Sequence, residues 1–176
     1  MTDKSTDLPE AAIRALAEAE ARIARCWHPY HRALRDLVES THAQFGQAVL
    51  IDCHSMPHEA IEHHSRPGRP APEVVLGDRF GASAAPWVID AVQAIFQAEG
   101  FRVVRNTPFA GAFIAQSYGR PSAGRHVVQI EIDRSLYMNE AAIEPLPSFG
   151  IFAERIERVV QQITGIARQS IPLAAE

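Results

Sequence analysis

About the first 45 residues carry the hydrophobic pattern of a long amphipathic helix. Apolar side chains recur there at spacings of three, four or seven residues, which places them on one helical face. They are Ile13, Leu16, Ile23, Trp27, Tyr30, Leu34, Leu37 and Val38. Pro29 lies inside this pattern and predicts a kink or a division into two helices, because proline removes a backbone donor. Gly46 predicts the end of the helix.

Short apolar runs after Gly46 predict strands, and two longer amphipathic segments predict helices. Residues 48–51 (AVLI) are apolar on both faces, which is typical of a strand buried between helices. The further strands are predicted at residues 73–76, 101–104 and 126–132, the helices at residues 83 or 84 to 99 and 149–168, and a loop at residues 55–72. Helices that alternate with short buried strands indicate an α/β fold, with a sheet covered by helices. The length predicts a single domain over residues 1–176.

Composition and charge narrow the function classes. The chain has a formal net charge of −4, so it lacks the basic excess that drives binding to nucleic acid. No apolar run approaches the roughly 20 residues of a membrane span, and the polar start lacks the apolar core of a secretory signal. Two cysteines, Cys26 and Cys53, are too few for a disulfide framework. These features predict a cytoplasmic protein with reduced thiols.

The segment Asp52-Cys53-His54-Ser55 directly follows the predicted strand 48–51. Ligands of α/β sheets bind beyond the carboxyl ends of the strands, so His54 is placed to face a ligand. A neutral imidazole is a common zinc donor, and a neighbouring carboxylate or carbonyl can fix its tautomer. The alternative is a histidine that hydrogen-bonds to its own loop. Sequence position favours neither interpretation.

Glu131 is embedded in the apolar strand HVVQIEI. Alternation along a strand places Val127, Gln129 and Glu131 on one face and the intervening apolar residues on the other. A carboxylate in such a strand must be paired, face a functional crevice or have a raised pKa. A glutamate with a raised pKa suits a general base that activates water. The alternatives are an edge strand with a solvated face, or a salt bridge to Arg134 or Arg120.

Other polar side chains give weaker signals. Arginines bind carboxylates through a bidentate fork, so a group of polar residues in glycine- or proline-flanked segments indicates a pocket for a small acidic molecule. These residues are Arg79, Asn106, Tyr118, Arg120 and Arg125. Cys53 beside His54 could act as a nucleophile, but no second histidine is placed to activate it. A small buried apolar role is the favoured interpretation for this cysteine.

The remaining histidines fall into two groups. His58, His63 and His64 lie in the predicted loop, where HEAIEH is one residue longer than the zinc motif H-E-x-x-H. We therefore expect surface histidines there. His28 and His31 are three residues apart and could face a site together, although Pro29 between them leaves that geometry open.

Four ordered segments resemble the N-formylglutamate amidohydrolase family. They are PYHRAL (29–34), AVLIDCHSMP (48–57), LGDRFGAS (76–83) and NTPFAGAFIAQSYGRPSAGRHVVQIEIDRSLYMNE (106–140). The resemblance implies hydrolysis of N-formyl-L-glutamate to formate and L-glutamate, a step of histidine degradation. It also implies zinc as the single divalent metal. The expected fold is a three-layer α/β sandwich with a mostly parallel or mixed sheet, similar to the zinc carboxypeptidases.

The resemblance also assigns roles by position. His54 is then a metal ligand and Glu131 the catalytic carboxylate. The implied substrate-binding residues are Arg79, Asn106, Tyr118 and Arg120. Zinc would polarise the formyl carbonyl and lower the pKa of its bound water, while the carboxylate takes the proton.

The motifs do not place a complete set of metal ligands, so three hypotheses about function stay open. Family members are longer at the N-terminus, and the resemblance implies that this part supplies a Pro-His-Ser-Gly-like element and an acidic residue to the metal. A catalytic zinc normally has three protein ligands, whereas the motifs place only His54. One hypothesis is an active amidohydrolase on a small acidic N-formyl amino acid, completed by a homo-oligomer or a complementing N-terminal half. The second is a catalytically inactive or truncated relative that binds a small molecule or a partner. A Cys53-dependent hydrolase is the third.

Overall fold

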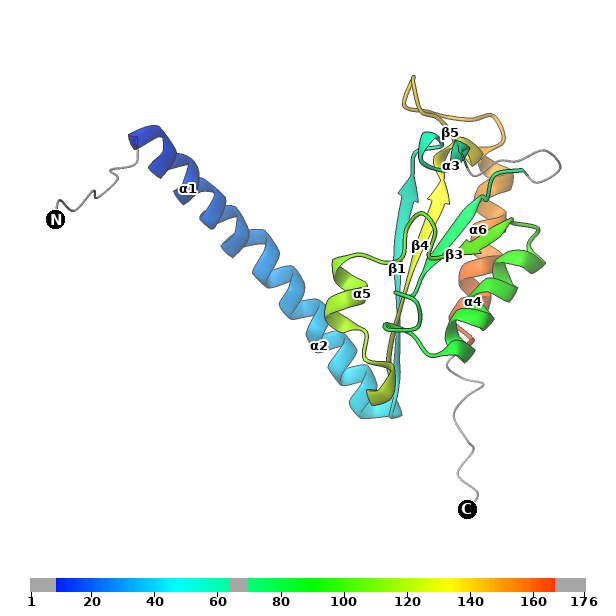
Figure 1. The fold of residues 1–176 in the computed structure, drawn as a ribbon, viewed down its shortest axis with the longest axis horizontal. Coiled ribbons are helices and arrows are strands. Elements are labelled where there is room, and N and C mark those ends of the chain that lie inside the picture. Colours follow the sequence, from blue (N-terminus) through cyan, green and yellow to red (C-terminus); the bar gives the residue numbers. More distant parts are fainter. Residues whose placement is uncertain (1–8, 64–69, 167–176) are drawn as a thin grey trace, which may run out of the picture.

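The structure is a computed structural model, and it describes residues 9–63 and 70–166. Its N-terminal part is a long helical rod that projects from the body of the molecule (Figure 1). The rod consists of α1 (Glu10–Arg22), a π-helical turn η1 (Ile23–Trp27) and α2 (His28–Phe45). The helical conformation continues without a break from Glu10 to Phe45, so the predicted interruption appears only as the π-helical turn η1, which ends directly before α2, whose first turn contains Pro29. Gly46 ends α2 with a left-handed φ of 71°, a conformation that glycine adopts without strain.

A mixed four-stranded sheet forms the centre of the body. Its strands are β1 (Ala48–Met56), β2 (Val74–Gly77), β3 (Val103–Arg105) and β4 (Arg125–Asp133), in the order β1-β4-β2-β3. β1 is parallel to β4, β4 is antiparallel to β2, and β2 is parallel to β3. This confirms the α/β class with a mixed sheet.

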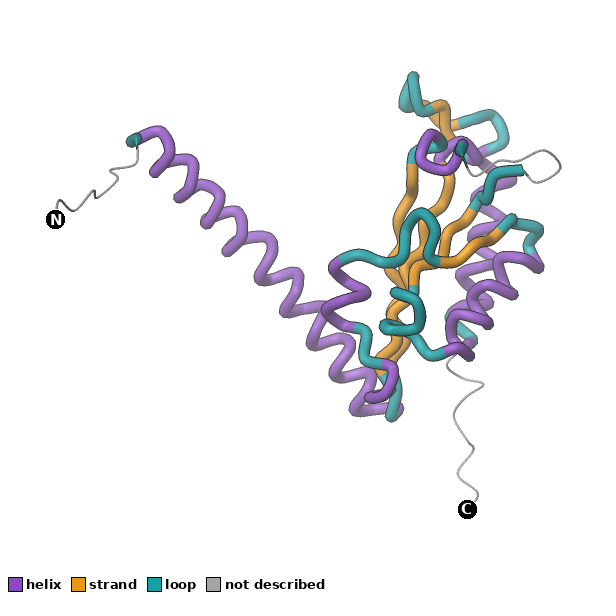
Figure 2. Tube along the Cα trace, in the orientation of Figure 1, coloured by secondary structure: helices purple, strands orange, loops and turns teal. Residues whose placement is uncertain are grey.

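Helices cover both faces of this sheet, as Figures 1 and 2 show. α4 (Pro86–Ala98) and α6 (Phe149–Ile163) lie on one face, and α2 and α5 (Phe113–Tyr118) lie on the other. Val128 and Ile130 of β4 belong to the core cluster that includes the buried side chains of α4. The neighbouring residues Gln129 and Glu131 therefore face α2 and α5, as the alternation predicted.

One strand differs from the prediction. Residues 48–51 were expected to be buried on both faces, but only Ala48 of this run is buried. Within the described residues β1 has a sheet neighbour on one side only, so its backbone and side chains are less covered than those of β4. β1 is also longer than predicted, because the polar residues Asp52 to Ser55 continue the pairing with β4.

The loops contain several short elements that the sequence pattern did not predict. These are α3 (Glu59–Glu62), η2 (Pro121–Ala123), η3 (Arg134–Leu136), β5 (Met138–Asn139) and β6 (Glu144–Pro145). The predicted end of the last helix, residues 167–168, and His64 lie outside the described residues. No described helix combines the length and the apolar character needed to cross a bilayer.

Arg155 fixes α6 against the turn that follows α4. Its guanidinium carbon lies 3.9 Å from the centroid of the Phe101 ring, and its Nε donates a hydrogen bond of 3.2 Å to the carbonyl oxygen of Glu99. We expect Arg155→Ala to lower the free energy of unfolding by about 1–2 kcal/mol, since a cation–π contact and a hydrogen bond are lost. Urea denaturation measures this loss. Arg14→Ala on the exposed α1 is the matched control, and an equal loss in both variants would contradict the assigned role.

Candidate active site

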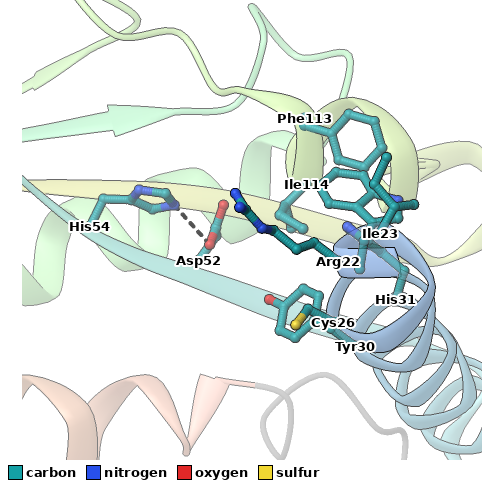
Figure 3. Close-up of a pocket in the computed structure, with 10 residues that line it drawn as sticks. Arg22, Ile23, Cys26, Tyr30, His31, Asp52, His54, Phe113 and Ile114 are labelled. Atoms are coloured by element: carbon teal, nitrogen blue, oxygen red, sulfur yellow. Dashed lines mark ion pairs between the residues drawn. The ribbon is translucent and has the colours of Figure 1, made fainter. Parts of the chain in front are cut away.

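His54 lies between two carboxylates on the sheet face covered by α2 and α5. Asp52 and His54 are two residues apart in β1, so they share a face, and the parallel register pairs His54 with Glu131 of β4. The Nε2 atom of His54 lies 2.9 Å from Oδ1 of Asp52 (Figure 3), and its Nδ1 atom lies 3.9 Å from Oε1 of Glu131. The structure therefore brings together the predicted metal ligand and the predicted base.

Glu131 is buried in the central strand and held by one hydrogen bond. Nε2 of Gln129 donates to its Oε1 at 2.8 Å, and Oε1 of Gln129 accepts from the backbone N–H of Ala112 at 2.7 Å. Burial is the main cause that raises the pKa of the Glu131 carboxyl, and His54 and the Gln129 hydrogen bond partly offset it. The carboxyl therefore keeps its proton to a higher pH than an exposed glutamate.

Neither of the alternative interpretations of Glu131 agrees with the structure. β4 has a neighbour on each side, so Glu131 is not on an edge strand. Among the described residues Glu131 forms no ion pair with an arginine. The guanidinium of Arg134 donates to Ser55, and that of Arg120 donates to the carbonyl oxygens of Gln116 and Gly119.

Gln129 is the residue that fixes Glu131 to the loop before α5, and the sequence analysis did not single it out. Its signal was available, because alternation places it on the same face as Glu131. We expect Gln129→Ala to cost about 1–3 kcal/mol of stability, since the substitution leaves the Ala112 N–H without its acceptor. Gln97→Ala, an exposed position on α4, should change stability by less than about 0.5 kcal/mol. Chemical denaturation of both variants tests this, and a similar small change in both would contradict it.

A cavity of about 740 Å³ opens beside His54, and most of its wall is apolar. It lies between the rod, α5 and β1, as Figure 3 shows. Its lining residues are Arg22, Ile23, Cys26, Trp27, Tyr30, His31, Asp52, His54, Phe113 and Ile114. This wall could not be predicted from the sequence, because the apolar stripe of the rod has the same pattern as a core-facing helix.

His31, a buried residue of this wall, forms a partly buried pair with Tyr118. The Tyr118 hydroxyl lies 2.7 Å from Nδ1 of His31 and donates to the His31 carbonyl oxygen at 3.1 Å. Burial raises the pKa of the Tyr118 phenol. Of the two histidines expected to share a site, His31 lines the cavity, whereas His28 is exposed and does not. Tyr118 thus reaches the site through His31.

Arg79 and Asn106 lie in two loops that are bonded to each other. Both residues have left-handed backbone conformations, with φ of 54° and 58°. Nδ2 of Asn106 donates to Oδ1 of Asp78 at 2.6 Å, and the backbone N–H of Arg79 donates to the Ala110 carbonyl at 2.7 Å. These loops lie next to Ala112, which holds Gln129, but neither Arg79 nor Asn106 lines the cavity. Their substrate-binding role, and that of Arg120 and Tyr118, stays a prediction.

The other candidate residues lie apart from His54. Nδ1 of His58 lies 2.8 Å from Oδ2 of the buried Asp133, and this hydrogen bond is the main cause that raises the pKa of His58. His63 is exposed, as predicted. Cys53 was expected to be buried but is exposed, and alternation places it on the opposite face from His54. Desolvation and the charge of Asp52 raise the pKa of its thiol, which disfavours a nucleophilic thiolate.

The site contains part of the donor set that a catalytic zinc requires. His54 contributes one imidazole, whose Nε2 lies 2.9 Å from Oδ1 of Asp52. In residues 9–63 and 70–166 no three histidine, cysteine or acidic side chains are grouped so as to hold a metal ion. A catalytic zinc normally takes three protein ligands, so the described residues do not complete such a centre.

Comparisons with known sequences point to one protein family. The family model described as N-formylglutamate amidohydrolase matches residues 2–138. N-formylglutamate deformylase of Pseudomonas aeruginosa is 34% identical over 142 residues, which are 80% of this chain and 52% of that protein. The enzyme of the same name from Pseudomonas putida is 33% identical over 147 residues, which are 83% of this chain and 53% of that protein. The chain thus spans about half the length of the curated relatives it matches.

Solved structures give the same result. The crystal structure of N-formylglutamate amidohydrolase from Ralstonia eutropha superposes with a TM-score of 0.76 at 36% identity, covering 87% of this chain and 54% of that one. A gene product of Agrobacterium tumefaciens, 20% identical, shares the fold with a TM-score of 0.51 and coverage of 92% and 57%. On the match to the family model and the identity to these relatives, the chain belongs to the N-formylglutamate amidohydrolase family.

Proposed function

We propose that this chain carries the catalytic carboxylate and one metal ligand of an amidohydrolase that acts on N-formyl-L-glutamate. The observation that carries the proposal is the pairing of His54 with Glu131 on adjacent strands, beside a cavity. The raised pKa of Glu131 suits a general base, because a buried carboxyl binds a proton more strongly than an exposed one. The names of the relatives supply the substrate. The reaction would serve histidine degradation in the cytoplasm.

Glu131 would move the proton in this reaction. A water molecule attacks the formyl carbon while Glu131 takes one of its protons. The carbon–nitrogen bond then breaks, and the proton passes from Glu131 to the amine nitrogen of the departing glutamate. Formate and L-glutamate leave. Gln129 keeps the carboxylate in place throughout, since it is bonded both to Glu131 and to the backbone of Ala112.

Zinc is the metal that we propose for this site, and His54 would be one of its ligands. The remaining ligands would come from a second copy of the chain or from a complementing N-terminal half. When bound, zinc supplies polarisation of the formyl carbonyl and lowers the pKa of a water molecule toward about 7.

The substrate is a small dianion, and the chain offers several groups that could hold its carboxylates. We propose Arg79, Asn106, Tyr118 and Arg120 for this role. Arg79 is the strongest of them, because its loop is bonded to the segment that holds Gln129. A guanidinium also binds a carboxylate through two parallel hydrogen bonds.

A second candidate function is a non-catalytic module that binds a small acidic molecule or a partner chain. It is favoured by the single imidazole that the described residues place beside Glu131. Retention of Glu131 on the central strand favours the enzyme instead, because an unused buried carboxylate costs free energy.

Zinc content separates the two functions. We expect about one zinc per chain after dialysis against metal-free buffer, measured by plasma mass spectrometry, and release of formate from N-formyl-L-glutamate. His54→Ala should lose the zinc and the activity, whereas His28→Ala, at an exposed position outside the cavity, should keep both. A chain without retained zinc and without formate release would contradict the enzyme and support the binding module.

A further inference from the structure

Asn106 lies directly after β3, and its side chain binds the turn that follows β2. Its Oδ1 atom accepts a hydrogen bond of 3.1 Å from the backbone N–H of Asp78 and one of 3.4 Å from that of Phe80. Its Nδ2 atom donates to Oδ1 of Asp78, a buried residue, at 2.6 Å. The N–H of Arg79 donates to the carbonyl oxygen of Ala110 at 2.7 Å. Three consecutive N–H groups of the turn are therefore bonded to the loop that follows β3.

The turn needs this support because two of its residues have an unfavourable backbone conformation. Arg79 and Phe80 have φ of 54° and 55°, in the left-handed region that residues other than glycine rarely adopt. Such conformations persist only where the surrounding structure imposes them. Packing of the Phe80 ring does not impose this one, because 78% of the residue is exposed. The hydrogen bond from its N–H to Asn106 is thus the support of the turn at this position.

The turn carries a guanidinium that has no other partner. Within residues 9–63 and 70–166, the half-buried side chain of Arg79 forms no hydrogen bond, ion pair or ring contact. Its Cγ atom lies beside Gly111, where an added Cβ atom would approach it to 3.2 Å. Gly111 directly precedes Ala112, whose N–H donates to Gln129. Arg79 therefore lies next to the segment that positions Glu131, with its donors available to a carboxylate.

We propose that Asn106 is a positioning residue that fixes the backbone on both sides of Arg79 and so presents the Arg79 guanidinium to a carboxylate of the substrate. The substrate carboxylate rests on the proposed function, whereas the support that Asn106 gives the turn does not. One N–H of Nδ2 remains beyond the bond to Asp78 and is available for the direct contact proposed above. The positioning role comes in addition, and it couples the effects of Asn106 and Arg79 on substrate binding.

Kinetics of formate release from N-formyl-L-glutamate test the positioning role. Asn106→Gly removes the amide but permits the left-handed backbone. We expect this variant to raise KM about 10-fold with little change in kcat, because the substrate carboxylate is held less well in the ground state and the transition state alike. Arg79→Gln should raise KM about 10–100-fold, and the double variant should be no worse than Arg79→Gln alone. Independent effects in the double variant, or a lower kcat at unchanged KM in Asn106→Gly, would overturn the positioning role.

Asn139→Gly is the matched control. Oδ1 of Asn139 also accepts from two backbone N–H groups, those of Ala141 and Ala142, in the exposed turn between β5 and β6. This variant should keep the wild-type KM. An equal rise of KM in both asparagine variants would contradict a specific role of Asn106.

Trypsin cleavage after Arg79 measures the support of the turn without any activity, because local opening exposes a loop to protease. Cleavage after Arg125, in the central strand β4, reports global unfolding. By mass spectrometry, we expect the ratio of the first rate to the second to rise about tenfold in Asn106→Gly, since hydrogen bonds of the turn are lost. Asn139→Gly should cleave like the wild type. An unchanged ratio in Asn106→Gly would overturn the proposal.

The wild-type protein decides if Asn106→Gly does not fold. The amide hydrogen of Phe80 should exchange slowly with water despite the exposure of the residue, because it is bonded to Asn106. Rapid exchange of this amide would overturn the proposal. A wild-type protein that releases no formate, together with faster cleavage after Arg79 in Asn106→Gly, would overturn the proposed function and leave the support of the turn by Asn106 intact.

Discussion

Replacing Glu131 by glutamine is expected to slow formate release from N-formyl-L-glutamate by about 10²–10⁴-fold, the usual contribution of a general base. Glutamine retains the shape of the side chain and a partner for Gln129, but it cannot take a proton from water. Zinc content should be unchanged, because the expected ligand is His54. A coupled formate assay and plasma mass spectrometry measure both quantities. Glu154→Gln, at an exposed position on α6, is the matched control.

The pH dependence of the wild-type activity, and of the stability of the wild type and the Glu131→Gln variant, provides a second check. Burial raises the pKa of Glu131 in the folded protein, so the carboxylate form is lost at a higher pH than for an ordinary glutamate, and kcat/KM should fall on the acid side from that higher pH. Stability changes with pH in the opposite direction to activity. The raised pKa of Glu131 stabilises the folded state at a pH below the pKa that this carboxyl has in the unfolded chain, and this contribution is lost as the pH rises through the pKa of the folded state. Glu131→Gln removes that loss and should be more stable than the wild type at neutral pH. Full activity in the variant, or a variant that is no more stable than the wild type at neutral pH, would contradict the assignment.

Gly77→Ala is expected to cost about 3 kcal/mol or more of stability, a large value for one added methyl group. A Cβ atom at this position would lie 2.5 Å from the backbone nitrogen of Gly111 and 2.6 Å from the carbonyl carbon of Ala110. Both atoms belong to the backbone, so the clash cannot be relieved by the movement of a flexible side chain. The loop must shift, and with it the Ala112 N–H that holds Gln129.

The displacement of this loop should also lower the rate of formate release. If Gln129 loses its support, Glu131 loses its fixed position, and misplacement of a catalytic group by about 1 Å can cost about 10²-fold in rate. Thermal unfolding and the formate assay measure the two effects together. Gly150→Ala is the matched control, because nothing lies within 4 Å of the added atom and the residue is helical. A Gly77→Ala protein as stable as this control would show that the loop is not held as described.

Part of the fold follows directly from local patterns. The alternation in HVVQIEI correctly assigned the two faces of β4, because a strand packed against helices must separate its apolar and polar sides. The predicted end of β1 was wrong, because polar residues follow its apolar run. Asp52 to Ser55 read as the end of a strand, yet they continue it, because their backbone pairs with β4. Polar side chains are tolerated there, since the faces of the sheet are less covered at a strand with one neighbour.

The candidate site could be predicted only in pieces. His54 and Glu131 were found as separate signals, but their pairing depends on the register of two strands more than 70 residues apart, which no local pattern encodes. The left-handed backbone of Arg79 and Asn106 gives no compositional signal either, because glycine is the residue that usually marks it. The cavity wall from Trp27 and Phe113 arises from the packing of α5 against the rod, which is a tertiary property.

The position of β1 at the side of the sheet affects how long the site geometry persists. Along this strand, every second amide points away from β4, and in the described residues it has no neighbouring strand to bond. Such amides exchange their hydrogens with water readily, and a strand held on one side opens locally at lower cost than a central one. His54 and Asp52 belong to this strand, whereas Glu131 belongs to β4. We therefore expect local opening of β1, and not global unfolding of the protein, to set the lifetime of the pairing between His54 and Glu131.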